Sequence, residues 1–392
     1  MLDFSNTEIA FSAKSDSDLR LAQILFTAIN SKALVAVLKG ATNVALTINF
    51  PVGWAVKPTL YRQFVGGERL DDCAKTGQVL AQSGVKSILD YSAEAGDTDA
   101  DIQNTYEETL RSIENAAKDE NVVFAVFKPT AMTSEDVLDK ANRKCQLTRA
   151  EQVKFDEYRE RVYNLCKRAH ELDVKILIDA EDFCFQDSID ELCEEMMREF
   201  NKDRAIVFNT LQMYRHDRLA YLERVYNDAV EGGYFLGIKF VRGAYMEKER
   251  ERALKGNYPS PICDTKELTD ENYNNGLRFT ISHIDKIETF CGTHNEHSNN
   301  VLAELLEKNG IAKNDDRVWF SQLYGMSDNI SYNLAHEGYN VTKYIPYAPV
   351  DKVLPYLIRR AEENTSMAGQ TSRELGYITT EMHRRKLSVH EG

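Results

Sequence analysis

Eight short apolar runs, each ending in a polar or charged residue, recur along the chain after residue 80 and are separated by stretches with helical patterning. Unbroken Val, Ile, Leu and Phe are typical of strands buried on both faces, and helices between such strands impose parallel pairing. The expected strands are Ser87–Tyr91 with a continuation to Glu94, Val122–Lys128, Ile176–Asp179, Ala205–Asn209, Gly237–Arg242, Glu288–His294, Val318–Leu323 and Lys343–Tyr347. A further helix is expected over Val350–Asn364.

The number and the endings of these runs favour a (βα)8 TIM-like parallel barrel over an open doubly wound sheet. The loops after all eight strands of a barrel meet at one face and build the active site, whereas an open sheet binds ligands only beside its switch point. Here the runs end at or next to side chains that can bind a ligand or take part in catalysis. No run is followed by the Gly-x-Gly-x-x-Gly sequence that marks dinucleotide-binding open sheets. We therefore predict an α/β barrel with a helix packed over its mouth after the eighth strand.

Three segments are expected along the chain. Residues 1–80 precede the first barrel strand and form an N-terminal helical arm or cap, residues 81–375 form the barrel, and residues 376–392 form a C-terminal tail. Met132–Ala169, which is rich in Lys, Arg and Glu, is expected to be a helical insertion on one crossover.

Composition and charge exclude several classes of protein. With 43% hydrophobic and 28% charged residues the chain is typical of a folded globular protein, and its net charge of −14 argues against nucleic acid as a partner. The seven cysteines are scattered without a Cys-x-x-Cys pair, which favours the reducing cytoplasm. The acidic residues within Met1–Arg20 are unlike a secretory signal or a transit peptide. The apolar stretch Leu21–Leu38 carries polar residues and is expected to be a core helix, not a membrane span.

The helix expected after the eighth strand carries two adjacent arginines, Arg359 and Arg360. Neighbouring residues diverge by about 100° on a helix, so two guanidinium groups can approach one carboxylate from different sides. Tyr356 and Glu363 lie on neighbouring faces of the same helix. An arbitrary Arg-Arg pair is most often a solvated surface pair, but the position at the mouth of the barrel favours a site for a small carboxylate ligand.

Two other features are ambiguous when taken alone. Lys128 at the end of the second run is most often a surface lysine in such a position, and a Schiff-base lysine is the alternative, because barrel aldolases place one at a strand end. His294 and His297 have an i, i+3 spacing that suggests a metal, but no third ligand is evident and no metal is expected.

Five motifs in the same order resemble the proline dehydrogenase family. They are IDAED at 178–182, KFVRGAY at 239–245, THN at 293–295, YAP at 347–349 and YLIRRAEEN at 356–364. The similarity covers roughly residues 60 to 375. It implies a monofunctional flavoenzyme whose barrel holds FAD without a covalent bond. The implied reaction is the first step of proline catabolism, in which L-proline becomes Δ1-pyrroline-5-carboxylate by hydride transfer from substrate C5 to flavin N5. Electrons then pass to a membrane quinone, which implies a cytoplasmic enzyme with peripheral contact at the inner face of the membrane.

The resemblance also implies the residues that bind the substrate. Arg359 and Arg360 match the arginines that hold the carboxylate, and Lys128 matches a lysine that supports it. Glu94 matches a glutamate that pairs with the first arginine as a gate. The remaining matches are Asp179, which orients its neighbours, Tyr347 and Tyr356, which form aromatic walls against the pyrrolidine ring, and Leu323, which makes an apolar contact.

A second set matches or neighbours positions that contact the flavin. It comprises Asn209, Gln212, Lys239, Arg242, Gly243, Ala244, Thr293, His294, Asn295 and Glu363. Met246 and Asn209 depart from the family pattern, since bacterial bifunctional relatives carry Trp and Gln there.

Three alternatives stay open. A hydroxyproline dehydrogenase of the same family must accommodate a C4 hydroxyl beside Tyr347, whose bulk favours proline. A lyase without a cofactor would use Lys128 as a Schiff base. A binding or regulatory barrel would use the arginines as an amino-acid sensor.

Overall fold

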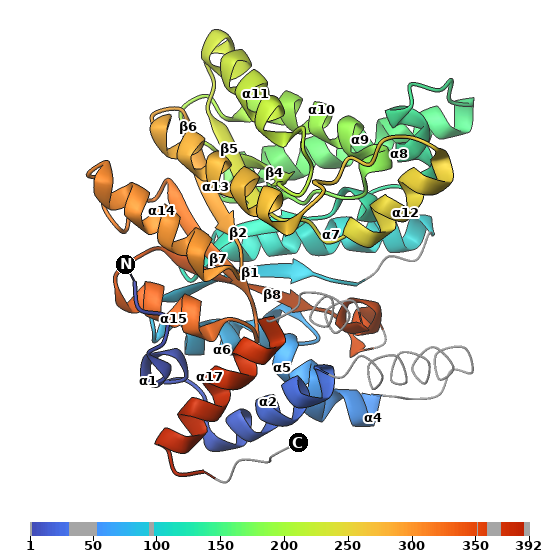
Figure 1. The fold of residues 1–392 in the computed structure, drawn as a ribbon. Coiled ribbons are helices and arrows are strands. Elements are labelled where there is room, and N and C mark those ends of the chain that lie inside the picture. The colour runs from blue at the N-terminus through green and yellow to red at the C-terminus, as the bar shows by residue number, and fades with distance from the viewer. Residues whose placement is uncertain (1, 31–52, 94–97, 351, 359–369, 388–392) are drawn as a thin grey trace. The chain divides into compact units, whose positions relative to one another are not determined.

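The chain forms a closed parallel barrel in which the eight strands follow one another in the order β1 to β8 (Figure 1). The computed structural model describes residues 2–30, 53–93, 98–350, 352–358 and 370–387. The strands are β1 (Val85–Tyr91), β2 (Val122–Phe127), β3 (Lys175–Ile178), β4 (Val207–Gln212), β5 (Leu236–Val241), β6 (Ile287–Gly292), β7 (Val318–Leu323) and β8 (Val341–Tyr347). The barrel predicted from the eight apolar runs is confirmed.

Several helices precede the first strand, and at least one helix follows each strand. Before β1 come α1 (Thr7–Ala10), α2 (Asp16–Ile29), α4 (Gly53–Val56), the π-helical turn η1 (Lys57–Tyr61), α5 (Arg62–Phe64) and α6 (Leu70–Ala81). Between β1 and β5 lie α7 (Asp99–Ala116), the 3-10 turn η2 (Pro129–Ala131), α8 (Glu135–Asn142), α9 (Arg149–Glu171), α10 (Phe183–Phe200) and α11 (Arg218–Gly232). After β5 come α12 (Met246–Gly256), α13 (Lys266–Ser282), α14 (Glu296–Lys308), α15 (Asp328–His336) and α17 (Gln370–Arg384). Residues 352–358, after β8, are helical as expected.

Side-chain caps fix where several of these helices begin. Thr98, Thr148 and Thr265 each accept a hydrogen bond from the backbone N–H three residues later, at the starts of α7, α9 and α13. Thr148 and Glu151 form a complete capping box. Such a cap satisfies N–H groups that have no partner within the helix, so it marks a helix start in the sequence.

The fourth strand ends three residues later than its apolar run predicts. β4 continues to Gln212 because Thr210, Leu211 and Gln212 pair in parallel register with β5. Asn209 therefore lies inside the strand, and Gln212 takes its place at the end.

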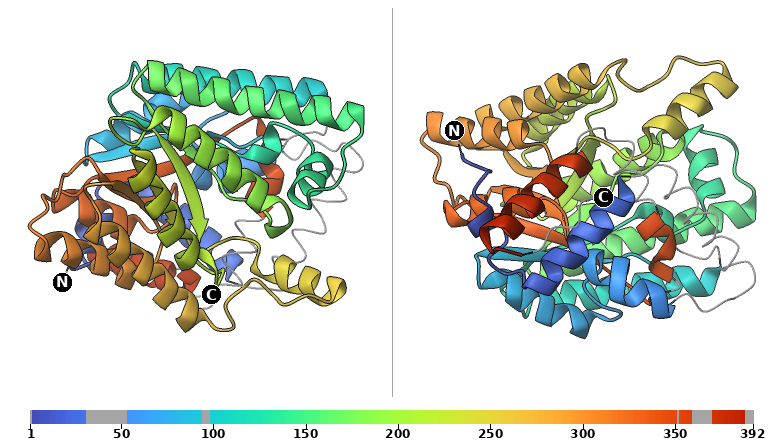
Figure 2. Two further views of the ribbon diagram at one scale, coloured as in Figure 1. Left: turned by 90° about the horizontal axis from the view of Figure 1, so that it is seen from above. Right: turned by 60° about the horizontal axis from the view of Figure 1, so that its bottom comes forward.

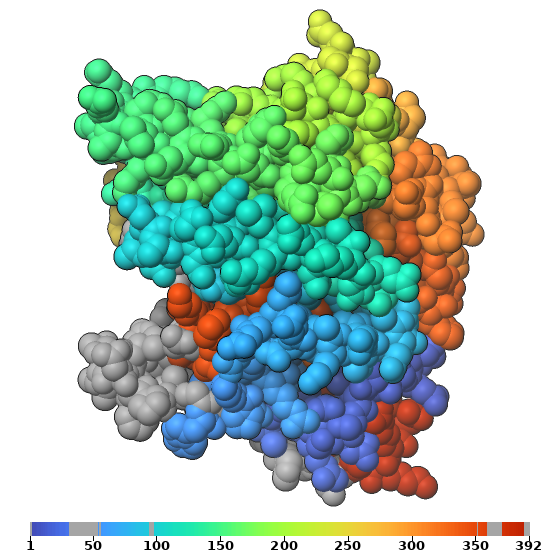
Figure 3. All heavy atoms as spheres, turned by 180° about the vertical axis from the view of Figure 1, so that it is seen from behind, coloured from blue at the N-terminus to red at the C-terminus, as the bar shows by residue number. Residues whose placement is uncertain are grey.

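The chain divides into two compact units, residues 95–321 and residues 2–94 together with 322–392. In the first unit, α9 packs against both α7 and α10, and Figure 3 shows the side chains of these helices as a continuous cyan-to-green surface. Inside this unit, Phe124 makes edge contacts with the rings of Phe208 and Phe290. The ammonium group of Lys175 lies 5.8 Å from the ring centre of Phe124 and 2.6 Å from Oε2 of Glu288. An apolar core thus encloses one ion pair.

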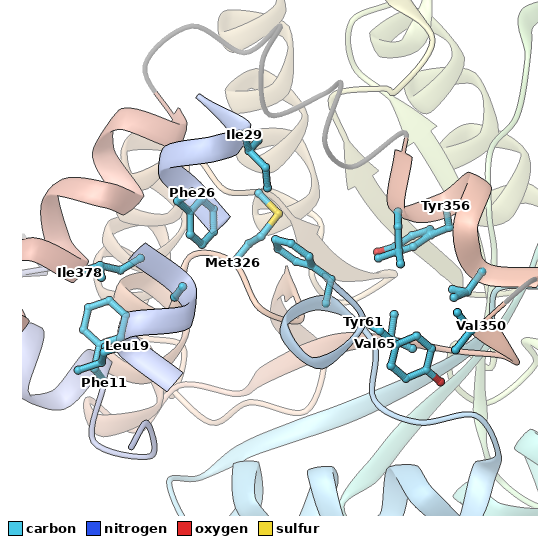
Figure 4. Close-up of a cluster of buried hydrophobic side chains, with 14 of the residues drawn as sticks. Phe11, Leu19, Phe26, Ile29, Tyr61, Val65, Met326, Val350, Tyr356 and Ile378 are labelled. Carbon is cyan, nitrogen blue, oxygen red and sulfur yellow. The ribbon is translucent and has the colours of Figure 1, made fainter. Parts of the chain in front are cut away.

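In the second unit, β1 pairs with β8 over seven residues, from Val85 with Val341 to Tyr91 with Tyr347. The C-terminal helix α17 packs beside α2 (Figure 2). A buried apolar cluster joins these elements, and Figure 4 shows Phe26 of α2, Ile378 of α17 and Tyr356 among its members. Within the described part of the chain, no helix is long and apolar enough to cross a membrane.

Candidate active site

Two lysines share one carboxylate near the carboxyl ends of β2, β3 and β5 of the first unit: Lys128 follows β2, Asp179 follows β3, and Lys239 lies two residues before the end of β5. Nζ of Lys239 lies 2.5 Å from Oδ1 of Asp179, and Nζ of Lys128 lies 3.4 Å from Oδ2. β3 pairs with β2 up to Ile178 and Phe127, and the N–H of Asp179 then donates to the carbonyl of Phe127. Since parallel strands end at one edge, residues that follow them in register come together. The structure thus brings together three of the predicted residues.

These three side chains differ in exposure. The Lys239 side chain is 7% exposed and that of Asp179 14%, whereas that of Lys128 is 31% exposed. Lys128 is therefore the cation of this group that is most accessible to a solute, and Lys239 lies deeper, with Nζ 5.8 Å from the ring centre of Phe290. Two ammonium groups thus lie beside one carboxylate in a protein of net charge −14.

Glu181, in the same motif as Asp179, extends the polar group. Its Oε1 accepts a hydrogen bond from the hydroxyl of Thr130 at 2.7 Å, and its Oε2 one from the hydroxyl of Tyr245 at 3.3 Å. Burial raises the pKa of Glu181 to about 7, with a further rise from Asp179, while Thr130 and Lys128 oppose the shift. This carboxyl group titrates near neutral pH. The reading of the sequence did not single out Glu181, although the IDAED motif contains it.

Gln212 and Asn209 have different surroundings in β4. Gln212 donates to the backbone carbonyl of Glu181 at 3.0 Å, so it touches the polar group at the strand ends. Asn209 donates to Asp190 of α10 at 3.0 Å and to the hydroxyl of Tyr221 of α11 at 3.1 Å. The structure therefore does not bring Asn209 to the strand-end group, because β4 runs on past it.

Arg242, directly after β5, is engaged by side chains of three elements. It donates from Nε to Asp270 at 2.8 Å, from Nη1 to Thr293 at 2.5 Å and from Nη2 to Ser298 at 2.9 Å. Its guanidinium carbon lies 4.5 Å from the ring centre of Tyr273. The predicted residues Arg242 and Thr293 are thus neighbours, and both are anchored.

The residues that follow Arg242 and Thr293 in the sequence set the local backbone conformation. Gly243 has φ of +121°, and a Cβ there would meet the ring of Tyr214 at 2.5 Å, so the position requires glycine. Ala244, the next residue, is exposed. Asn295 caps α14 by accepting from the N–H of Ser298 at 3.0 Å, and its own N–H donates to Thr293. His294 follows Thr293 and is half-buried.

The predicted apolar residues lie in the second unit. Tyr347 is 1% and Tyr356 6% exposed, and the partly buried Leu323 packs against the cluster that contains Tyr356. The ring of Tyr347 lies 5.4 Å from that of Tyr91 at an angle of 52°. Tyr91 keeps part of its surface exposed and packs on the same cluster. Tyr91 was not predicted, although the last position of the first run carries an aromatic residue.

Four predicted residues lie outside the described part of the chain. They are Glu94, Arg359, Arg360 and Glu363. Among the residues that are described, no three His, Cys, Asp or Glu side chains are grouped as metal ligands.

Comparison with known proteins finds one family whose model matches most of the chain. The family model described as "Proline dehydrogenase" matches residues 73–373. The chain is 35% identical over 322 residues to the carbapenem antibiotics biosynthesis protein CarD of Pectobacterium carotovorum subsp. carotovorum, which covers 82% of this chain and 83% of CarD. It is 38% identical over 243 residues to the human mitochondrial proline dehydrogenase 1, which covers 61% of this chain and 40% of that protein.

The fold has a counterpart among solved structures. The proline utilization A protein (PutA) of Bdellovibrio bacteriovorus, inactivated by N-propargylglycine, aligns with a TM-score of 0.72 and 22% identity over 92% of this chain. The alignment covers 38% of the PutA chain, so this chain spans about two-fifths of the length of that protein and of the human relative.

Proposed function

Because this chain belongs to the proline dehydrogenase family and is an oxidoreductase of that family, we propose that it oxidises L-proline to Δ1-pyrroline-5-carboxylate with bound FAD. The observation that carries the proposal is the Lys128–Asp179–Lys239 group, in which two cations share one carboxylate near the carboxyl ends of β2, β3 and β5. A carboxylate substrate and an anionic cofactor both require such a cationic surface.

The donors of the first unit suit a flavin cofactor. Lys239, Arg242, Thr293 and Gln212 offer ammonium, guanidinium, hydroxyl and amide donors at the ends of β4, β5 and β6. Donors of this kind bind a diphosphate and stabilise a reduced ring that carries negative charge. When bound, FAD supplies the acceptor for the hydride that leaves the substrate carbon next to nitrogen.

We assign the substrate carboxylate to Lys128, together with Arg359 and Arg360 from the family match. Lys128 is the more exposed lysine of its pair and supplies a point charge. Asp179 holds Lys128 and Lys239 in place through its two oxygens. Glu94, which the family match pairs with Arg359, is proposed to open and close with the substrate, and Glu363 to contact the cofactor.

The aromatic residues of the second unit are proposed to size the substrate ring. Tyr347 is fixed by backbone hydrogen bonding of its carbonyl with Ser92 at 3.1 Å and by the contact with Tyr91. A fixed bulky ring favours proline over 4-hydroxyproline.

A Schiff-base mechanism at Lys128 is disfavoured by the same geometry. A nucleophilic lysine must leave its ion pair before it can attack a carbonyl group, and Nζ of Lys128 lies 3.4 Å from Oδ2 of Asp179. Quinone as the electron acceptor, and peripheral contact with the membrane that dissolves it, remain proposals from the family match.

An anaerobic absorbance spectrum of the purified protein, recorded before and after L-proline is added, tests the function. We expect a flavin band that bleaches with proline. A colourless protein that borohydride traps with a carbonyl substrate would support the lyase instead. Tight proline binding without bleaching or dye reduction would indicate a sensor.

A further inference from the structure

Arg242 is held in one position by an unusually complete set of partners. Asp270 of α13 receives two contacts, from Nε at 2.8 Å and from Nη2 at 2.7 Å. The hydroxyls of Thr293 and Ser298 receive the others, and the ring of Tyr273 lies against the guanidinium plane. The Arg242 side chain is only 18% exposed. A long side chain with this many contacts has lost its rotamer freedom before any ligand arrives.

Asp270 is the charged partner in this set. Its other oxygen, Oδ2, lies 2.5 Å from Nζ of Lys266, one helical turn earlier on α13. Partial burial opposes ionisation, but hydrogen bonds and charge from Lys266 and Arg242 lower the pKa of Asp270 below its ordinary value. The carboxylate is therefore ionised at neutral pH, and its hydrogen bonds to the guanidinium are of the strong, charge-assisted kind.

We propose that Asp270 is a positioning residue that aims Arg242 at the anionic part of the flavin cofactor. The inference rests on the proposed function, because it takes Arg242 and Thr293 as cofactor contacts. Asp270 binds the Nε edge of Arg242 and shares Nη2 with Ser298, while Nη1 points to Thr293. The carboxylate fixes one edge of the planar group, so the opposite edge faces the end of β6. An arginine without such partners would lose side-chain conformational entropy when the cofactor binds. The contacts with Asp270 remove that entropic cost, because Arg242 is already ordered.

The experiment measures the dissociation constant of FAD from each variant by quenching of flavin fluorescence during titration of the apoprotein. For Asp270→Ala we expect about tenfold weaker binding, within the usual range for residues coupled through one network. Asp270→Asn retains an acceptor oxygen for Nε and is expected to fall between the wild type and Asp270→Ala. Circular dichroism checks the fold, and if Asp270→Ala does not fold, the Asn variant of the same shape carries the test.

A double-mutant cycle separates positioning from a purely structural role. Arg242→Met alone weakens FAD binding, and adding Asp270→Ala to it is expected to cause no further loss, because Asp270 then has no arginine to hold. Additive losses would overturn the proposal, as would an Asp270→Ala variant that binds FAD like the wild type. Lys266→Ala is the matched control, since Lys266 contacts Asp270 but not Arg242 in the described contacts. A loss equal to that of Asp270→Ala would assign the effect to the surface charge of α13 and overturn the proposal.

The outcomes distinguish this inference from the function on which it rests. A wild-type protein that binds FAD but is not reduced by proline contradicts the proposed reaction, while the cycle still decides the role of Asp270. A wild-type protein that binds no flavin overturns both.

Discussion

At the level of single residues, the proposed reaction depends on the charge around Asp179. The ammonium groups of Lys128 and Lys239 both lie beside Asp179, so two positive charges stand near the proposed position of the substrate. A secondary amine, like lysine, has a pKa of about 10 in water, and hydride transfer requires its neutral form. Nearby positive charge lowers the pKa of such an amine. The reaction should therefore proceed more readily as the pH rises.

The first prediction concerns this pH dependence. We expect the rate constant for flavin reduction by L-proline to rise from neutral to alkaline pH, and Lys128→Met to raise the apparent pKa of that rise by about one unit, because one nearby cation is lost. Stopped-flow reduction of the flavin between pH 6.5 and 9.5 measures it, and Lys128→Arg, which keeps the charge, is the control. A flat profile up to pH 9 in the wild type would contradict the argument.

A second residue-level prediction concerns Tyr91. It packs against Tyr347 and retains exposed surface, whereas Tyr347 is buried. Removing the Tyr91 ring should free the ring of Tyr347 to tilt and enlarge the space for a C4 substituent. We expect Tyr91→Ala to raise the ratio of kcat/KM for 4-hydroxyproline to that for proline about tenfold, and Tyr91→Phe to leave it near the wild-type value. An unchanged ratio in the Ala variant would place Tyr91 away from the substrate.

At the level of elements, a buried carboxyl group attaches α17 to the loop after β7. Oε1 of Glu374 accepts hydrogen bonds from the backbone N–H of Ser327 at 2.6 Å and from its hydroxyl at 3.0 Å. Ser327 has a φ of +50°, a backbone conformation that residues other than glycine rarely adopt. Burial raises the pKa of Glu374 to about 7, and the charge of Asp328 adds to the rise, while Ser327 and Lys343 oppose it.

This shift predicts how stability changes with pH. An unfolded glutamate has a pKa of about 4.3, so between roughly pH 4.5 and 7 the folded state binds more protons than the unfolded state. Stability therefore falls as the pH rises through this window, by on the order of 3 kcal/mol for one such group. Glu374→Gln should remove the contribution of Glu374 to the slope of unfolding free energy against pH, measured by urea denaturation at a series of pH values.

Glu181 carries a similar pKa shift and serves as the control. Its contribution to the slope should persist in Glu374→Gln and disappear in the double variant with Glu181→Gln. A slope that both substitutions leave intact would show that other groups cause it.

The neighbouring ion pair of β8 leads to a separate prediction. Lys343 is fully buried, and its Nζ lies 2.8 Å from Oδ1 of Asp328. Although burial acts against it, the charges of Lys343 and Lys14 hold the pKa of Asp328 below its ordinary value. Of the ion-pair partners that the described residues give Asp328, Lys343→Met leaves the more distant Lys14, 3.7 Å away, and the change should cost about 3 to 5 kcal/mol. Adding Asp328→Asn should restore part of this loss in guanidinium denaturation. If the double variant is less stable than the single one, the pair is not the cause.

The elements also show which features the sequence can predict. All eight strands were predicted because unbroken apolar runs report burial on both faces, and this depends only on local residues. The end of β4 was missed because its last residues, Thr210 to Gln212, are held by pairing with β5, which a local pattern does not contain. Asp270 was missed for a similar reason: within its polar stretch it looks like a solvated helix residue, and only the fold brings Arg242 to it. Lys128 and Asp179 were predicted from strand-end positions together with the family match, and Lys239 from the family motif; the structure places the three side chains side by side.

At the level of the whole molecule, a buried ion pair of the first unit contacts residues in or directly before four strands. Nζ of Lys175, at the start of β3, contacts Glu288 of β6 and donates to the carbonyl of Asp316, which precedes β7. Oε1 of Glu288 accepts from the N–H of Ala205, which precedes β4. Both side chains are under 10% exposed. An apolar run predicts that a strand is buried, but not that a strand on another side of the barrel supplies the counter-charge, so this pair was not predicted.

The last prediction follows from the cost of an unpaired buried charge. Lys175→Met leaves Glu288 with one backbone donor in an apolar core and should reduce the free energy of unfolding by about 3 to 5 kcal/mol. Because the aromatic rings around Lys175 offer an apolar environment, the double variant Lys175→Met with Glu288→Leu should regain most of that loss, apart from about 1 kcal/mol for the unsatisfied N–H of Ala205. Calorimetric melting of the two single variants and the double variant measures the coupling between the two residues. If the loss of stability in the double variant equals the sum of the losses in the two single variants, the interaction between Lys175 and Glu288 contributes nothing to stability. Packing alone would then hold the strands in register.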